Sequence, residues 1–179
     1  MTLDPAIDAT SRALLALLFA GAALRKLAAP SDFRAAVRDY RLVPAPAAGA
    51  VAVGLVAAEI AVAVALGVPA LRSVALAGAA TLLLVYAAAI GINLARGRAI
   101  DCGCGGPAAG RPISRWLVAR NVALATVALA AAGPIASRPL VWVDALTIAA
   151  ATVGCALLYA ATDRLLRHAP ALAALREPS

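Results

Sequence analysis

Apolar residues along this chain form five long runs, separated from one another by short polar or turn-rich segments. A transmembrane helix needs about twenty consecutive, mostly apolar residues. The sequence therefore predicts one all-helical membrane domain over residues 1–179, a bundle of four to five transmembrane helices. The first span is the least regular, because Arg12 and Arg25 shorten its apolar centre. The predicted spans cover residues 7–27, 47–66, 70–95, 113–132 and 140–162.

Residues 30–44, between the first two spans, have a different pattern. Phe33 and Val37 fall on one face of a helix, whereas Arg34 and Arg38 fall largely on another. An amphipathic helix with arginines on its polar face is typical of the membrane interface. We expect a short interfacial helix here, and an ordinary solvated loop is the alternative.

Composition and charge support a membrane protein. Hydrophobic residues make up 64% of the chain, against about 45–50% in a typical soluble domain. The net charge is +7, but the basic residues lie between apolar runs without interleaved aromatic residues, so we expect no nucleic-acid partner. The start of the chain has Asp4 and Asp8 and no basic segment, so we expect the first apolar run to be retained rather than cleaved as a signal peptide.

The distribution of basic residues predicts the orientation. Twelve Lys and Arg residues follow the first, third and fifth spans, whereas only Arg12, Arg72 and Arg138 lie on the other side. Because basic residues in short loops favour the cytoplasmic face, we expect the amino terminus to be outside the plasma membrane. The loop 96–112 and the tail 163–179 would then be cytoplasmic.

The loop between the third and fourth spans carries the pair Cys102-Gly103-Cys104. A disulfide between thiols this close in sequence closes a small, strained ring, and strained disulfides are readily reduced. Gly103 gives the backbone the freedom that such a ring needs. Four arginines flank the loop and favour the reactive thiolate, while Asp101 is a candidate local proton acceptor. The pattern favours a thiol–disulfide oxidoreductase.

Two other roles for the cysteines remain open. A zinc site is poorly supported, because zinc needs four ligands and His168 is the only histidine. A pair of thiolates suits Cu(I), which makes a Cu(I) or small-molecule carrier an alternative. The cysteines can also be structural, and Cys155, inside the fifth span, is expected to be a small buried apolar residue.

Several polar residues fall inside or at the ends of the predicted spans, where they are costly and often functional. These are Lys26, Glu59, Asn93, Arg120 and Asn121. The depths of Glu59 and Arg120 predict a buried ion pair between them. The group is expected to form a polar pocket beneath the cysteine loop, suited to a proton path or to a small redox partner such as a quinone. The alternative is a structural network that holds the helices together.

These motifs together resemble the methylamine utilisation protein MauE family, within the DoxX-like membrane proteins. The resemblance rests on Phe19 to Leu27, on Phe33 to Pro44, on Glu59, on Asp101 to Gly105 and on Arg120-Asn121. It implies a bundle similar to vitamin K epoxide reductase, a role in forming or handling disulfides during maturation of a methylamine dehydrogenase subunit, and a redox role for Cys102 and Cys104. The chain differs at Gly106, where many members have an aromatic residue.

The leading hypothesis is therefore a membrane protein that exchanges disulfides with a thioredoxin-like or substrate protein. A non-catalytic scaffold that docks a soluble protein is the alternative from another class. The predicted cytoplasmic loop is unexpected for an oxidant of proteins outside the cell, and it favours exchange with a cytoplasmic thiol protein. The sequence does not predict an oligomeric state.

Overall fold

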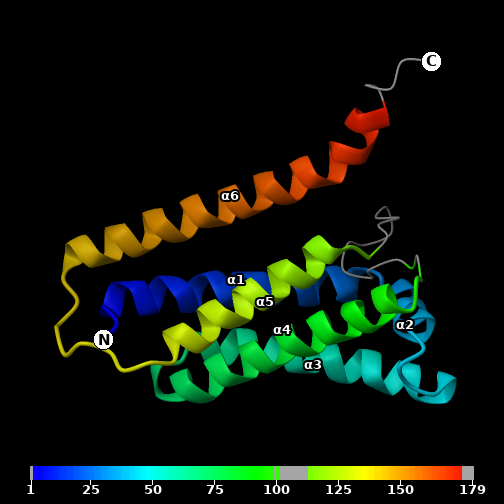
Figure 1. Cartoon of the computed structure of the whole chain (residues 1–179). Coiled ribbons are helices and arrows are strands. Elements are labelled where there is room, and N and C mark those ends of the chain that lie inside the picture. Colours follow the sequence, from blue (N-terminus) through cyan, green and yellow to red (C-terminus); the bar gives the residue numbers. More distant parts are fainter. Residues whose placement is uncertain (1, 99, 101–112, 175–179) are drawn as a thin grey trace.

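The computed structural model describes residues 2–98, 100 and 113–174, with only the backbone described from residue 163 onward. Its helices pack into a bundle whose long members run roughly side by side (Figure 1). They are α1 (Pro5–Ala28), α2 (Pro30–Asp39), α3 (Ala48–Leu66), α4 (Arg72–Ala95), α5 (Arg115–Ala131) and α6 (Trp142–Ala174), with short 3₁₀ turns η1 (Ala45–Ala47) and η2 (Pro69–Leu71). The predicted all-α bundle is confirmed.

The helix boundaries follow local sequence signals. Asp4 caps α1 by accepting a hydrogen bond from the Ala6 backbone N–H at 2.8 Å, and Pro5 begins the helix without losing a hydrogen bond. At the end of α4, Gly97 takes a positive φ of 66°. The Gly97 and Arg98 backbone N–H groups then bond back to the carbonyls of Leu94 and Asn93, a Schellman arrangement that favours glycine at this position.

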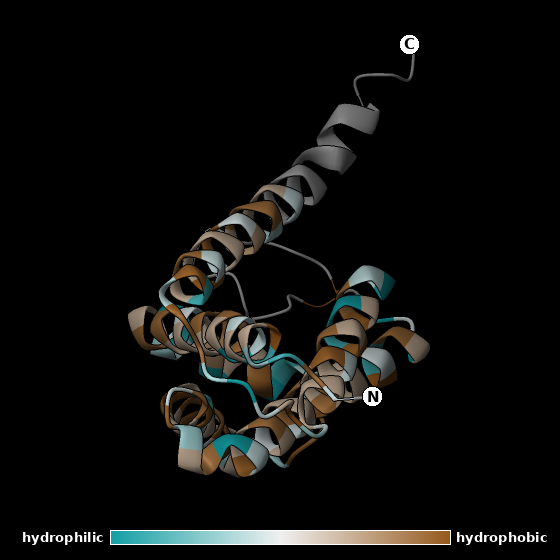
Figure 2. Ribbon diagram, turned by 90° about the vertical axis from the view of Figure 1, so that its left-hand side faces the viewer, coloured by the Kyte–Doolittle hydropathy of each residue, from teal (hydrophilic) through white to brown (hydrophobic). Residues whose placement is uncertain are grey.

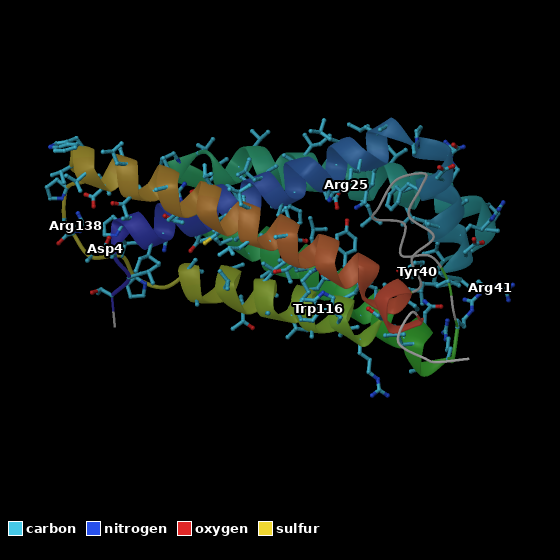
Figure 3. All side chains as sticks on the ribbon, turned by 90° about the horizontal axis from the view of Figure 1, so that it is seen from above. Asp4, Arg25, Tyr40, Arg41, Trp116 and Arg138 are labelled. Carbon is cyan, nitrogen blue, oxygen red and sulfur yellow. The ribbon has the colours of Figure 1, made fainter. Side chains whose placement is uncertain are left out.

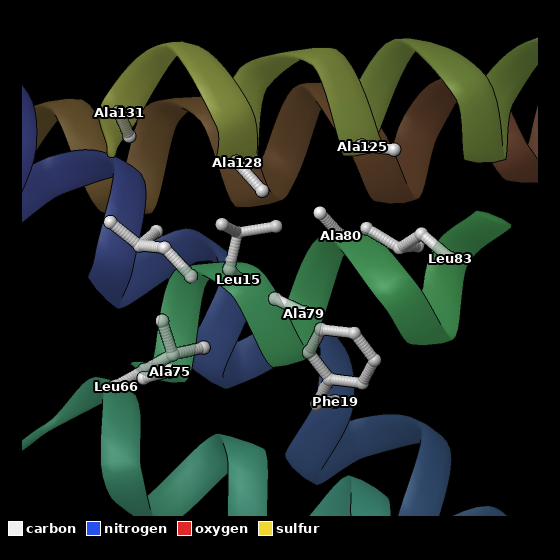
Figure 4. Close-up of a cluster of buried hydrophobic side chains, with 11 residues drawn as sticks. Leu15, Phe19, Leu66, Ala75, Ala79, Ala80, Leu83, Ala125, Ala128 and Ala131 are labelled. Atoms are coloured by element: carbon white, nitrogen blue, oxygen red, sulfur yellow. The ribbon is translucent and has the colours of Figure 1, made fainter. Parts of the chain in front are cut away.

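Small side chains let the central helices approach one another closely. Ala79 and Ala80 of α4 belong to one buried cluster with Ala125 and Ala128 of α5, and all four are at most 2% exposed. Leucines and the ring of Phe19 fill the space between these helices and α1 (Figure 4). Close packing of small residues is a main source of helix association in membranes, where lipid supplies no hydrophobic force between helices.

Within residues 2–98 and 113–174, four helices are long and apolar enough to cross a membrane. They cover Pro5–Ala28, Ala45–Leu66, Pro69–Ala95 and Trp142–Thr162. α5 is shorter, with 17 residues, so it is the predicted span that is not among these four. Hydrophobic residues dominate the outer faces of the helices (Figure 2), and only 6% of the α6 span is buried, as expected for helices in lipid.

The segment after α1 contains α2, which packs against α3. Phe33 and Ala36 of α2 are buried, whereas Arg34 and Arg38 are exposed. This is the two-faced pattern read from the sequence, with the apolar face turned into the protein. α2 therefore closes one end of the bundle.

Charged residues fasten the opposite end. Asp8 is 3% exposed and accepts hydrogen bonds from Arg12 at 3.0 Å and from Arg72 at 2.8 Å. Arg12 also donates to the Leu66 carbonyl at the end of α3. Arg72 donates to the carbonyls of Ala131 and Gly133 at the end of α5. Each arginine thus satisfies carbonyls that a helix end leaves without partners.

Candidate functional site

A buried ionic cluster joins α1, α3 and α4. Lys26 is 3% exposed and Glu59 is fully buried. The Lys26 Nζ donates to Glu59 Oε1 and, at 3.1 Å, to the Tyr86 hydroxyl. The Tyr86 hydroxyl in turn donates to the same Glu59 oxygen at 2.7 Å. The Lys26 ammonium also lies 4.7 Å from the ring centres of both Phe33 and Tyr86, within cation–π range.

The predicted Glu59–Arg120 ion pair is wrong. Glu59 is paired with Lys26, while Arg120 Nη1 donates to the hydroxyl of Tyr159 at 3.0 Å. Depth along the helices was an insufficient guide, because the choice of partner depends on which helices are neighbours. α3 packs against α1, which carries Lys26, whereas α5 packs mainly against α4 and directs the Arg120 guanidinium to Tyr159 of α6.

Asn93 lies outside this cluster, near the carboxyl end of α4. It is fully buried, and its side chain donates to the Ala89 carbonyl at 3.1 Å and accepts from Arg98 Nη1 at 3.0 Å. Arg98 also donates to the Tyr40 carbonyl at 3.3 Å. Asn93 therefore holds the end of α4 to the residue that follows α2, and it does not line the cavity described next.

A cavity of about 220 Å³ lies beside the Lys26 cluster, between α1, α2, α3, α4 and α5. Its walls are almost entirely apolar, with Leu55 and Ile90 among the lining residues. Its few polar lining groups include Lys26, Arg120 and Asn121, which the sequence analysis expected to form a pocket. The structure therefore brings three of the five predicted polar residues to one cavity, with Glu59 held behind Lys26.

Tyr86 is the member of this site that sequence reasoning missed. Its hydroxyl completes the Lys26–Glu59 cluster, and its side chain lines the cavity. A signal was present, because a tyrosine inside an apolar span usually has a hydrogen-bond partner for its hydroxyl. The sequence did not show that α4 packs against α3, which brings the Tyr86 hydroxyl to Glu59.

The predicted redox residues Cys102 and Cys104, with Asp101, lie outside the described residues, but the chain on either side is described. The Ile113 backbone N–H donates to the Ile100 carbonyl at 2.9 Å. Ile113 forms an apolar cluster with Ile90 and Leu117, against which Tyr40 and Ile100 pack. Because Ile90 and Tyr40 also line the cavity, both anchors of the cysteine segment lie beside it.

Comparison with known proteins identifies the chain. Residues 4–134 match the family model described as methylamine utilisation protein MauE. The chain belongs to the MauE family. This match contains Lys26, Glu59, both cysteines of the pair and Asn121, and it ends before α6 begins. Together with the apolar helices, membership of the MauE family makes this a multi-pass membrane protein.

Curated MauE proteins are similar over most of the chain. The methylamine utilization protein MauE of Paracoccus denitrificans is 45% identical over 128 residues, which cover 71% of this chain and 69% of the relative. That of Paracoccus versutus is 43% identical, covering 76% and 74%. That of Methylophilus methylotrophus is 36% identical, covering 93% and 89%. Comparison with solved structures finds no match.

Proposed function

We propose that this protein is a membrane thiol–disulfide redox protein of methylamine utilisation, which forms or exchanges a disulfide in a partner protein through Cys102 and Cys104. The curated relatives carry methylamine utilisation in their names, which supports the process. The chemistry is supported by the sequence, in which two of the three cysteines stand one glycine apart. Such a pair suits reversible disulfide formation.

The observation that carries the proposal is the anchoring of the cysteine segment. The Ile100–Ile113 hydrogen bond joins the two ends of the segment beside the cavity. The chain thus leaves and re-enters the described part of the bundle at the end that carries the Lys26 cluster, which supports a redox role for the segment between Ile100 and Ile113.

A thiolate of the partner attacks the Cys102–Cys104 disulfide and forms a mixed disulfide, which the second partner thiol resolves. The partner loses two electrons and two protons and gains a disulfide, while Cys102 and Cys104 become thiols. A two-electron acceptor must then restore the pair, and we propose a second thiol protein or a membrane quinone for that step.

Trapping of the mixed disulfide tests the proposal. In a Cys155→Ser background, Cys102→Ser and Cys104→Ser each leave one thiolate of the pair. This thiolate can attack the disulfide of the oxidised partner, in the reverse of the exchange above, and no neighbouring thiol is present to resolve the mixed disulfide that forms. We expect one of the two variants to accumulate a covalent complex with a thiol protein that reductant dissolves. The double variant is the control and should form none. Absence of a covalent complex from both single variants, in cells that receive methylamine together with a second carbon source, would contradict the proposal.

A scaffold is the second candidate, because α2 presents exposed Arg34 and Arg38 at the same end of the bundle. A charged helix face suits docking of an acidic soluble protein. The Cys102→Ser/Cys104→Ser variant separates the two functions. A scaffold would still support growth on methylamine, whereas a redox protein would not. Under the scaffold hypothesis, Arg34→Glu/Arg38→Glu should abolish growth on methylamine.

A further inference from the structure

Among the residues that the structure describes, none neutralises the charge of Arg120. Lys26 and Glu59 neutralise each other. Arg120 donates only to the neutral Tyr159 hydroxyl, and its buried Nε has no hydrogen-bond partner. Within the described part of the chain no carboxylate pairs with it. An arginine in the middle of a bundle of membrane helices is costly and usually meets a ligand or an opposite charge, so a negatively polarised group is needed beside it.

Asn121 supplies a second polar group at the same cavity. The residue is 4% exposed and lines the cavity, yet its amide makes no hydrogen bond with any described residue. An asparagine amide offers two donors and one acceptor oxygen, and buried polar groups are nearly always hydrogen-bonded. Arg120 and Asn121, adjacent in α5, therefore both line this cavity with donor groups that no described residue satisfies in full.

The rest of the cavity suits an apolar molecule that enters from lipid. Val51 and Leu55 of α3, with Ile90 of α4, provide aliphatic walls. Val85 also lines the cavity, lies within the span Pro69–Ala95 and is 48% exposed. In a membrane protein an exposed apolar side chain within a span faces lipid tails. The wall that contains Val85 is therefore the side from which a molecule dissolved in lipid would enter.

We propose that this cavity binds the oxygen-bearing head of a lipid-soluble molecule, with the Asn121 amide and the Arg120 guanidinium donating to its carbonyl or carboxylate oxygen. A volume of about 220 Å³ far exceeds the roughly 30 Å³ of one water, and it accepts a ring-sized head while an apolar tail lies in lipid. If the occupant is a quinone, the site rests on the proposed function and names its electron acceptor, but binding itself uses neither cysteine and can be measured apart from the redox reaction. A quinone and a free fatty acid both have this chemistry.

Binding is measured on the Cys102→Ser/Cys104→Ser protein in nanodiscs, so that loss of redox chemistry cannot affect the result. The probes are decylubiquinone, dodecanoate and decylbenzene, which has an apolar ring and tail but no oxygen. We expect saturable binding of decylubiquinone, of dodecanoate or of both, at one molecule per chain. Decylbenzene should bind at least tenfold more weakly. The probe that binds more tightly identifies the source of the ligand.

Two matched pairs of variants locate the site. Ala89→Leu adds three carbons to the cavity wall, and Ala88→Leu adds them to the exposed face of the same helix. Asn121→Leu removes the unpaired amide, and Thr126→Val removes an exposed hydroxyl from the same helix. We expect Ala89→Leu and Asn121→Leu to weaken binding at least tenfold, and both controls to leave it unchanged.

Three results would each overturn the proposal. They are no saturable binding of either oxygen-bearing probe, equal binding of decylbenzene, and wild-type affinity in both Ala89→Leu and Asn121→Leu. The last would indicate that the probe dissolves in lipid or binds elsewhere, and that water satisfies the donors of α5. Ala89→Leu removes no polar group, so the test still discriminates if Asn121→Leu fails to fold.

Discussion

At the scale of single residues, the Lys26–Glu59 contact is a buried ion pair between two membrane helices. Both side chains are at most 2% exposed, so neither charge is stabilised by water. Two buried charges hold each other in place even where the pair as a whole adds little stability, because removal of either partner leaves the other uncompensated. Tyr86 adds a hydrogen bond to each member.

This asymmetry predicts a strong coupling. Lys26→Met or Glu59→Leu alone should lower the free energy of unfolding by about 3–5 kcal/mol, whereas the double variant should recover most of that loss. The measurement is unfolding in mixed micelles by titration with a denaturing detergent. Additive losses in the double variant would show that the two charges do not depend on each other.

At the scale of helices, Arg72 connects the beginning of α4 with the end of α5. Its guanidinium spans Asp8 of α1 and the carbonyls of Ala131 and Gly133. These carbonyls lie where a helix has no further N–H groups to offer. A positive charge at a helix carboxyl end is favourable, because the dipoles of the backbone leave that end partly negative.

Loss of Arg72 should therefore destabilise two helix contacts together. Hydrogen bonds that involve a charged group contribute about 1.5–3 kcal/mol each, so we expect Arg72→Met to lower the free energy of unfolding by more than about 3 kcal/mol. Arg96→Met is the control, since Arg96 is exposed at the other end of the same helix. Equal effects of the two substitutions in the same detergent titration would contradict a specific role for Arg72.

The chain segment before α6 is fastened by one arginine between two carboxylates. Arg138 Nε and Nη2 donate to Asp4, each at 2.8 Å, and Nη1 and Nη2 donate to Asp144 at 2.7 and 2.8 Å. Arg138 and Asp4 lie together at one end of the molecule (Figure 3). The hydrogen bonds from Arg138, followed by that from the Ala6 backbone, hold the pKa of Asp4 below its ordinary value.

The lowered pKa of Asp4 makes this clamp sensitive to acid. A carboxylate with a depressed pKa contributes stability that is complete above its ordinary pKa and is lost as the pH falls through the depressed value. We expect Arg138→Gln to raise the pKa of Asp4 toward its ordinary value of 3.8. Titration of the Asp4 carboxyl carbon by NMR measures this shift. An unchanged pKa in Arg138→Gln would show that the ion pair does not form in solution.

At the scale of the whole molecule, the two ends of the bundle are chemically different. One end holds the Asp8 and Arg138 networks, and Leu3 is paired there with the segment after α5 through backbone hydrogen bonds to Pro134 and Ala136. The other end holds α2, the Lys26 cluster and the anchors of the cysteine segment. Twelve of the basic residues belong to this second end or to the tail, so we propose that it faces the cytoplasm.

Labelling with a membrane-impermeant thiol reagent tests this orientation. In a Cys155→Ser background treated with reductant, Cys102 and Cys104 should be labelled only after the cells are permeabilised. Ser137→Cys, placed at the exposed opposite end in a variant without the pair, should be labelled in intact cells. The reverse pattern would place the cysteine segment outside and make an extracytoplasmic protein its partner.

The sequence by itself determined that this is a helical membrane protein, and it singled out most of the polar residues that lie within the helices. Runs of about twenty apolar residues have one stable outcome in lipid, because only a helix satisfies its own backbone there. Lys26, Glu59 and Asn121 could be selected for the same reason, since a polar group inside such a run is conspicuous. The cysteine pair was equally visible, and its redox role stays a prediction.

Only the tertiary structure decided which of these groups meet. Helix neighbours are set by the packing of small side chains over whole faces, and no pattern within one helix specifies its partner. Packing placed Lys26 rather than Arg120 against Glu59, added Tyr86 to the pair and assigned Asn93 to the end of α4. It also placed Arg120, which no described carboxylate neutralises, and Asn121 beside an apolar cavity where five segments of the chain converge.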